Sequence, residues 1–178
     1  MIYDPATNQV ISDSKDIVQY LDEQYPTTQK LIVDPASEDE LEAAILKNVL
    51  MNFPLSTFMV LHNRTSAPAG QHIRKIREAQ FGATLEELST EDAVRQQWER
   101  LENGYTNLSE LYKKAGTTFL SKRDVPIWAD LVAGSVLISQ KFLYGEDSEQ
   151  WKSILEWDGG FWKKLIEALQ VYEGEGIE

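Results

Sequence analysis

The sequence predicts a mainly helical domain in which several helices surround one buried helix, preceded by a short β-β-α unit. The first observation is the stretch 125–143 (VPIWADLVAGSVLISQKFL), in which apolar residues fall on almost every face of a helix. Such a helix is typically buried, and this one is too short and too interrupted to cross a membrane. The second is a repeat of large apolar residues at spacings of four and three from Val94 to Tyr112, typical of one helix face packed on a core.

The N-terminal residues 1–26 are predicted to form a hairpin followed by a helix. Short strands are expected at residues 2–3 and 9–11, on either side of a turn rich in Asp, Pro and Asn. Ser14 is expected to cap the helix. The inward face of this helix is predicted to carry Ile17, Val18, Tyr20 and Leu21. Because a lone two-stranded hairpin is marginal in water, we expect this unit to be the end of a larger sheet.

A linker at residues 27–36 separates this unit from the helical part. Ser37 and Glu40 form an S-x-x-E capping box, which predicts that a long helix begins there. Pro54 is expected to kink or break that helix. Residues 65–71, which contain Pro68 and Gly70, are expected to interrupt it again.

The C-terminal half begins with a second cap signal at residues 89–92 (STED), and Gly116 is expected to end the helix that follows. A short helix near residues 148–155 and a final helix follow the apolar stretch, giving about six helices after the β-β-α unit. The final helix is predicted to bury Trp162, Leu165, Ile166, Leu169 and Tyr172. We expect four segments in all: residues 1–26, the linker 27–36, a helical domain at 37–172, and a frayed tail at 173–178.

Composition excludes several classes of function. A net charge of −12 argues against nucleic acids and anionic membranes as partners, since phosphate binding needs clustered Lys and Arg. The absence of cysteine removes disulfides, thiolate metal sites and a Cys nucleophile from these residues. His62 and His72 lack the ligand spacing of a metal site, so no metal is expected. The N-terminal residues do not resemble a signal peptide, and we expect a cytoplasmic protein.

Three stretches resemble glutathione transferases. Residues 10–21 (VISDSKDIVQYL) resemble the end of that family's thioredoxin-like domain, where an acidic residue or Gln followed by Ser begins a helix. Residues 128–130 (WAD) match the start of the core helix in the family's helical domain. Residues 74–88 and 157–162 (WDGGFW) are similar to the fungal FuA class, which is related to bacterial β-etherases. The resemblance implies a transferase C-terminal helical bundle around a buried core helix, preceded by a β-β-α remnant of a thioredoxin-like domain.

Two departures from the family pattern matter. Ile127 replaces the Ser or Thr that caps the family's core helix, and losing such a cap costs about 1 kcal/mol in typical helices. Asp130 is expected to remain as the structural cap, because its carboxylate can accept from free N–H groups at the helix start. By resemblance, a complete transferase also begins upstream of Met1, and we expect its thiol-activating residue there. No catalytic residue is therefore assigned within these 178 residues.

The resemblance implies glutathione as co-substrate, bound by Asp13 and Ser14. Ser14 would offer a hydroxyl at a helix N-terminus, which attracts a carboxylate, and Asp13 would accept the ammonium of the γ-glutamyl group. The acceptor would be a hydrophobic or aromatic electrophile. The wall of its pocket is expected to include Phe53, Phe58, Leu61, His62 and Trp128. For each of these residues a purely structural role, as a cap or in the core, stays open.

Three functions remain open at this point. The first is a glutathione S-transferase that conjugates glutathione, or transfers a thiol, to aromatic electrophiles. The second is a non-catalytic helical domain that binds aromatic ligands or a partner chain. The third is a repurposed isomerase or cyclase of fungal secondary metabolism, because a fold does not fix a function. Unpaired strand edges and exposed apolar surface beside them predict self-association, with a homodimer as the simplest form.

Overall fold

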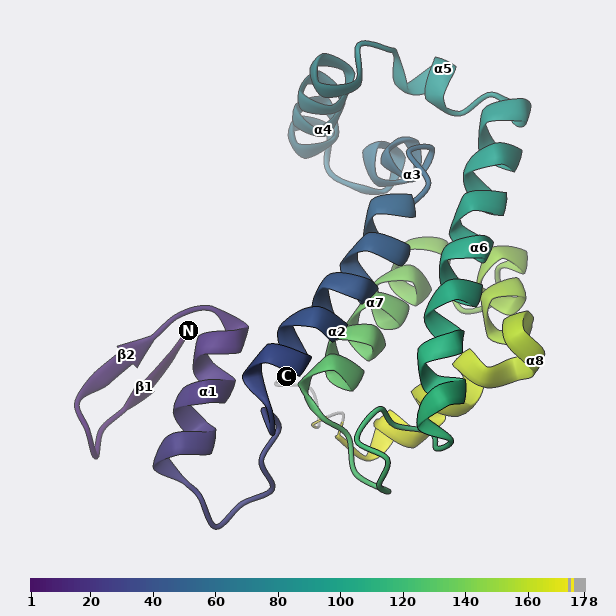
Figure 1. Ribbon diagram of the computed structural model, residues 1–178. Helices are drawn as coiled ribbons and strands as arrows, with labels where there is room; N and C mark the ends of the chain where they lie inside the picture. Colours follow the sequence, from purple (N-terminus) through teal and green to yellow (C-terminus); the bar gives the residue numbers. More distant parts are fainter. Residues whose placement is uncertain (173, 175–178) are drawn as a thin grey trace.

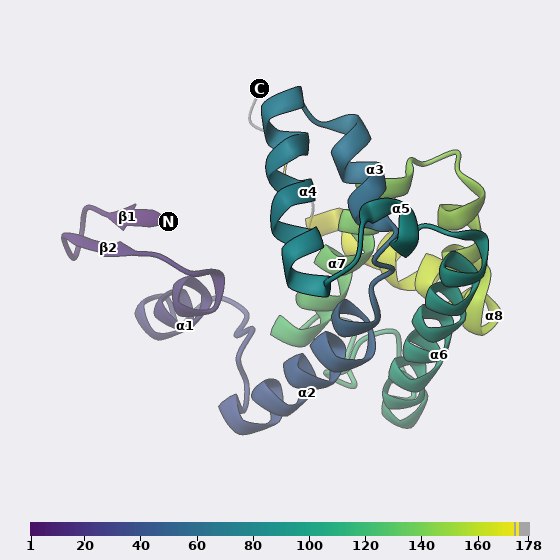
Figure 2. The same ribbon diagram turned by 90° about the horizontal axis from the view of Figure 1, so that it is seen from above.

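The computed structural model describes residues 1–172 and 174. A small β-β-α unit stands to one side of a larger helical body, and an extended linker joins the two (Figures 1 and 2). Within the body, α7 packs against α2 and α8, and α6 packs against the same two helices. The predicted mainly α architecture around a central helix is confirmed.

The β-β-α unit consists of β1 (Ile2–Asp4), β2 (Gln9–Ile11) and α1 (Ser14–Gln24). The strands are antiparallel, with Tyr3 opposite Val10. Both of these side chains are exposed. The expectation of self-association stays a prediction. Asp13, rather than Ser14 as expected, is the N-cap of α1, because its carboxylate accepts from the Lys15 N–H. Leu21, expected to face inward, is also exposed.

The long helix α2 (Pro35–Asn48) begins two residues before the predicted capping box. Pro35 occupies its first turn, where a missing N–H costs nothing, and Asp34 is the N-cap. The Ser37 hydroxyl donates back to the Asp34 carboxylate at 2.6 Å, so the box with Glu40 does not form. The predicted break at Pro54 is confirmed: η1 (Leu50–Asn52) and then α3 (Thr57–Arg64) follow, with a bend of 76°.

Three helices follow α3, and the last of them belongs to the core of the body. They are α4 (Ala67–Phe81), the single turn α5 (Leu85–Leu88) and α6 (Glu91–Ala115). The interruption predicted at residues 65–71 is present, but it is confined to Thr65 and Ser66. Pro68 sits in the first turn of α4, where proline is favoured. Thr90 caps α6 and Gly116 ends it in the left-handed conformation, as the two signals predicted.

The core helix α7 (Trp128–Tyr144) lies at the centre of the body, followed by α8 (Glu149–Leu169) and η2 (Gln170–Tyr172). Its predicted burial on every side is only partly correct: one face carries exposed Ser135, Ser139 and Phe142, the last 77% exposed. The span α8 contains the two helices predicted here, at residues 149–156 and 161–169, separated by residues 157–160, which have non-helical backbone angles. The expectation of a frayed tail falls on residues that, apart from Gly174, lie outside the described ones.

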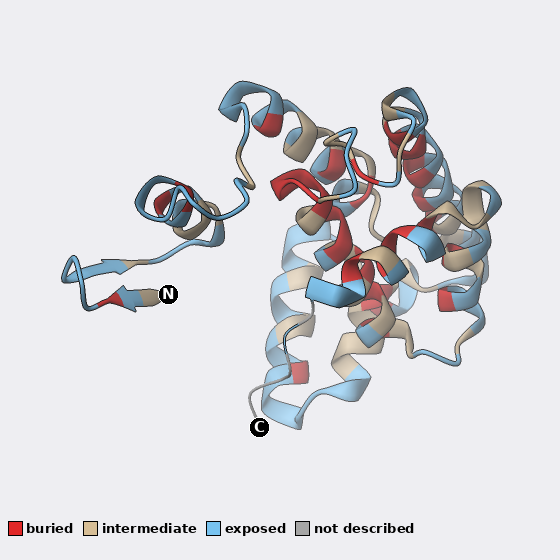
Figure 3. Cartoon of the chain, turned by 90° about the horizontal axis from the view of Figure 1, so that it is seen from below, coloured by how far each residue is buried: buried red, intermediate tan, exposed pale blue. Residues whose placement is uncertain are grey.

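The buried residues gather where α2, α6, α7 and α8 meet (Figure 3). Trp162 is fully buried, and its ring makes edge contacts with Tyr105 at 4.8 Å and Tyr112 at 6.0 Å between centroids. Edge-to-face aromatic contacts at these distances add to the stability gained from burial alone.

Within residues 1–172, no single helix is long and apolar enough to cross a membrane. One bent pair, Pro35–Asn52 with Thr57–Arg64, passes that test by length and composition only.

Candidate functional site

The predicted glutathione-binding pair lies at the exposed N-terminus of α1. Asp13 has φ 81° and ψ 136°, a conformation that residues with a side chain rarely adopt. Its carboxylate accepts from the Lys15 N–H at 3.0 Å, which holds the turn in place. Because Asp13 provides the cap, the Ser14 hydroxyl is left without a hydrogen-bond partner among the described residues. A strained residue beside a free hydroxyl at a helix N-terminus is typical of a functional site.

A buried carboxylate, Asp4, fixes α1 against the hairpin. It accepts from the hydroxyls of Tyr20 at 2.7 Å and Tyr25 at 3.1 Å, and from the Ala6 N–H at 2.8 Å. The Tyr20 hydroxyl, followed by the other donors, holds the pKa of Asp4 below its usual range. These bonds hold the end of β1 and the start of the turn after it against α1.

Hydrogen bonds to the backbone of the linker hold it against α1 and α7. Asp22, on α1, accepts from the N–H groups of Leu31 and Ile32 at 2.7 to 3.1 Å. The Leu31 carbonyl in turn accepts from the Trp128 N–H at 3.0 Å. The start of the core helix is therefore connected to α1 through a single linker residue.

Glu38 supplies the acceptor that Ile127 cannot. Its buried carboxylate, on α2, accepts from the Ala129 N–H at 3.0 Å. Asp130, also buried, accepts from the N–H groups of Ile127 and Leu120, both at 3.0 Å. Two carboxylates thus take the place of one capping side chain at the N-terminus of α7. Burial raises the pKa of both Glu38 and Asp130 above their usual ranges.

We predict that two substitutions of Glu38 change the free energy of unfolding in different ways. Glu38→Ala leaves the buried Ala129 N–H unpaired and is expected to lower the free energy of unfolding by about 2 kcal/mol. Glu38→Gln keeps an acceptor and removes the charge. A carboxyl whose pKa is raised by folding stabilises the protein below its unfolded pKa, near 4, and loses this contribution as pH rises through the folded value.

The stability of Glu38→Gln, measured relative to wild type by urea unfolding, is therefore expected to increase between pH 4 and pH 7. A difference that stays constant with pH would contradict the raised pKa. Glu40→Gln, on the same helix but exposed, is the control and should show no such trend.

The five residues predicted to form the acceptor wall do not share one pocket. Phe53 and Leu61 line a mostly apolar pocket of about 380 Å³. Arg64 lies at its edge and donates to the carbonyls of Phe142 and Leu143, at the C-terminal end of α7. The remaining wall of this pocket is formed by Ser139, Phe142 and Leu143.

Phe58, His62 and Trp128 lie elsewhere. The Phe58 ring stacks on Phe81 at 6.0 Å between centroids, and the Arg77 guanidinium lies 4.4 Å from its centre. The buried Nδ1 of His62 has no partner among the described residues. Trp128 lies at the opposite end of α7 from Phe142, and its indole N–H donates to Glu42 at 3.3 Å.

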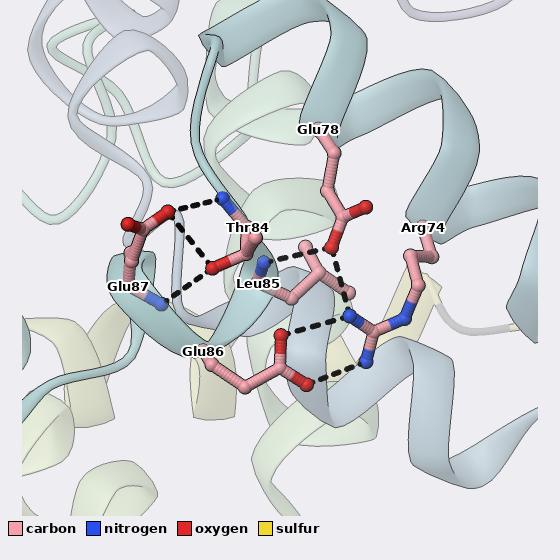
Figure 4. Close-up of polar contacts among 6 residues, drawn as sticks. All are labelled: Arg74, Glu78, Thr84, Leu85, Glu86 and Glu87. Carbon is pink, nitrogen blue, oxygen red and sulfur yellow. Dashed lines mark hydrogen bonds and ion pairs between the residues drawn. The ribbon is translucent and has the colours of Figure 1, made fainter.

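The segment 74–88, part of the FuA resemblance, forms a charged junction between α4 and α5 (Figure 4). The Arg74 guanidinium donates twice to Glu86 and once to Glu78, each at 2.8 Å. Glu78 also accepts from the Leu85 N–H at 3.1 Å. Arg74 lowers the pKa of Glu86 to about 2. Thr84 and Glu87 close a capping box at the start of α5. This segment therefore stabilises a turn.

The sequence analysis assigned no role to Glu38 or Glu42 of α2. A signal was present for Glu38, since it precedes Leu41 and Ile45 at helical spacing on the inward face. It also missed a second pocket, of about 820 Å³, whose lining residues come from α3, α7 and α8 and include Ile138, Trp151, Leu155 and Lys163. No local pattern connects these residues. Within the described part of the chain, no group of three His, Asp or Glu side chains is placed to hold a metal ion.

Comparison with protein families and with curated proteins gave different outcomes. A family model described as the C-terminal domain of glutathione S-transferase matches residues 38–172. No curated protein sequence matches the chain.

Several solved structures similar to nearly the whole chain come from fungi. A glutathione S-transferase of Ceriporiopsis subvermispora, solved in complex with glutathione, is 28% identical, with a TM-score of 0.82 over 95% of this chain and 69% of its own. A second from that organism, also with glutathione, is 24% identical and shares the fold, with a TM-score of 0.86 over 99% and 72%. Glutathione transferase GSTFuA3 of Phanerochaete chrysosporium is 28% identical, with a TM-score of 0.83 over 98% and 70%.

Proposed function

Because the chain belongs to the glutathione S-transferase family, with a likeness to its fungal FuA class, we propose that it binds glutathione for transfer to hydrophobic or aromatic electrophiles. Asp13 and Ser14 are assigned to the γ-glutamyl end of glutathione. The observation that carries this assignment is the strained Asp13 beside the uncommitted Ser14 hydroxyl at the N-terminus of α1. Two Ceriporiopsis relatives were solved with glutathione, which supports the choice of ligand.

The chemistry of this site matches one end of glutathione. The γ-glutamyl group carries a carboxylate and an ammonium on the same carbon. The Ser14 hydroxyl and the positive end of the α1 dipole favour the carboxylate. The Asp13 carboxylate has one oxygen bound to the Lys15 N–H and a second available to the ammonium. The N-terminus of α1 and the Asp13 carboxylate can thus orient the ligand, the first through its carboxylate and the second through its ammonium.

The proposal assigns binding, and no step of thiol activation, to these 178 residues. Activation requires a donor that stabilises the thiolate and so lowers the pKa of the thiol. By family resemblance that donor belongs to the part of the fold that precedes the hairpin. The apolar pocket of Phe53 and Leu61 suits an aromatic ring better than a charged molecule, but it lies toward the end of α7 opposite Trp128. We therefore assign it to hydrophobic ligands and not to the acceptor of the transfer.

Calorimetric titration with glutathione tests the proposal. We expect saturable binding at millimolar concentrations or below, and an affinity about tenfold weaker for Ser14→Ala, the effect of one lost charge-assisted hydrogen bond. Ser12→Ala, an exposed serine just outside the helix, is the matched control and should bind as wild type does. Absence of binding by the wild-type chain would overturn the proposal.

A second titration addresses the apolar pocket of Phe53 and Leu61. A hydrophobic dye is expected to bind the wild-type chain and to bind more weakly to Phe53→Ala. A flat dye response would contradict the pocket assignment. Dye binding without any glutathione binding would instead favour the non-catalytic binding domain.

A further inference from the structure

One lysine connects the candidate glutathione site to the helical body. The Lys15 ammonium, on α1, lies 2.5 Å from the Asp39 carboxylate and 2.6 Å from the Glu42 carboxylate, both on α2. Lys15 and Glu42 are partly buried, with 32% and 23% of their side-chain surface exposed. Asp39 and Glu42, in that order, raise the pKa of Lys15, so the lysine stays charged throughout the physiological range.

The same residue also holds Asp13. The Lys15 backbone N–H donates to one carboxylate oxygen of Asp13, while the Lys15 side chain contacts α2. Because Lys15 immediately follows Ser14, a displacement of Lys15 would displace both residues assigned to glutathione. The geometry of the candidate site therefore depends on where α2 holds this lysine.

Glu42 extends the connection to the core helix. Its Oε2 atom accepts from the Lys15 ammonium and, at 3.3 Å, from the Trp128 indole N–H. One carboxylate oxygen thus joins α1, α2 and the first residue of α7. Trp128 is itself buried, and its backbone N–H is bound by Leu31, so Glu42 is attached to a rigid part of the body.

Few other contacts fix α1 relative to the body. Figures 1 and 2 show the hairpin and α1 standing apart from α3 to α8, joined through the linker. Among the described residues, the bonds made by Lys15 are the only direct side-chain hydrogen bonds or ion pairs between residues 1–24 and residues 35–172. An ion pair in that place has a larger influence on orientation than one on a helix that is already packed.

We propose that Lys15 and Glu42 are positioning residues for glutathione, which hold Asp13 and Ser14 in their binding geometry from α2. This inference rests on the proposed function. It assigns neither residue a contact with the ligand. It predicts instead that glutathione affinity depends on an ion pair located on the side of α1 that faces the helical body.

The test is calorimetric titration of glutathione into variants of the whole chain. Lys15→Met and Glu42→Gln are each expected to weaken binding about fivefold, the lower end of typical couplings between sites. Lys15→Arg, which keeps the charge, is expected to bind within a factor of about two of wild type. The double variant should be no weaker than Lys15→Met, because Glu42 has no ion pair to α1 left to lose once the lysine is removed.

Lys152→Met is the control, since Lys152 forms its own ion pair with Glu149 on the distant helix α8. Urea unfolding of every variant separates a loss of affinity from a loss of folding. Wild-type affinity in Lys15→Met, or additive losses in the double variant, would overturn the positioning role while leaving the proposed function intact. Failure of the wild-type chain to bind glutathione would overturn both.

Discussion

Replacing Asp130 by alanine is expected to lower the free energy of unfolding by about 4 kcal/mol, because two buried N–H groups lose their acceptor at about 2 kcal/mol each. These donors belong to Ile127, at the start of α7, and to Leu120, in the loop before it. Asp130 is fully buried, so water cannot replace the lost oxygens without a change in packing. Asp130 therefore joins Leu120, in the loop, to the first turn of the core helix.

Two further variants make the result specific. Asp130→Asn retains one carbonyl oxygen and is expected to lose about half as much, since its amide nitrogen cannot accept the second bond. Asp124→Ala removes an exposed carboxylate from the same loop and should change stability by less than about 0.5 kcal/mol. Urea unfolding followed by tryptophan fluorescence measures all three. A loss below about 1 kcal/mol for Asp130→Ala would mean that the two N–H groups find other acceptors.

Gly104→Ala is expected to destabilise the protein by about 3 kcal/mol, although helix propensity alone predicts a gain of about 1 kcal/mol at an interior helix position. Gly104 lies in α6 where this helix crosses α2. A methyl group added there would lie 1.8 Å from the Asn48 carbonyl oxygen and 2.9 Å from its carbonyl carbon. These are backbone atoms, so no side-chain rotation relieves the clash, and the two helices must separate.

The test is whether Gly104→Ala lowers or raises the stability of the protein. Asn103→Ala, at the exposed neighbouring position of α6, should follow helix propensity and change stability by less than about 0.7 kcal/mol, in the stabilising direction. Thermal and urea unfolding of both variants give the comparison. A stabilised Gly104→Ala would show that α2 and α6 do not approach as closely as the structure places them.

Several elements could be predicted from local chemistry alone. The Thr90 cap and the apolar repeat of α6 predicted that helix, because both signals lie within a few residues of the structure they specify. Pro54 broke the helix before it, as a missing N–H requires. The resemblance, in turn, identified a family that the match at residues 38–172 confirms.

Other predictions failed where two adjacent candidates competed. Ser14 and Asp13 are both good capping residues, and the sequence does not say which of them adopts the strained backbone conformation. Pro68 suits either a break or the first turn of a helix, and only the position of α4 against α3 distinguishes the two. The face of α7 at Ser135 and Ser139 is exposed because the neighbouring helices cover its other sides.

Residues close together in the chain were enough to specify the helical class and most helix boundaries. The pair Asp13 and Ser14 came from the family resemblance, and its role stays a prediction. How the site is held depends on contacts between distant parts of the chain. Lys15 meets Glu42 across 27 positions, and Glu38 meets Ala129 across 91. Contacts at such separations leave no periodic pattern, because each depends on how two helices cross. For the same reason, the sequence could not distinguish a carboxylate that organises the core helix from one that faces solvent.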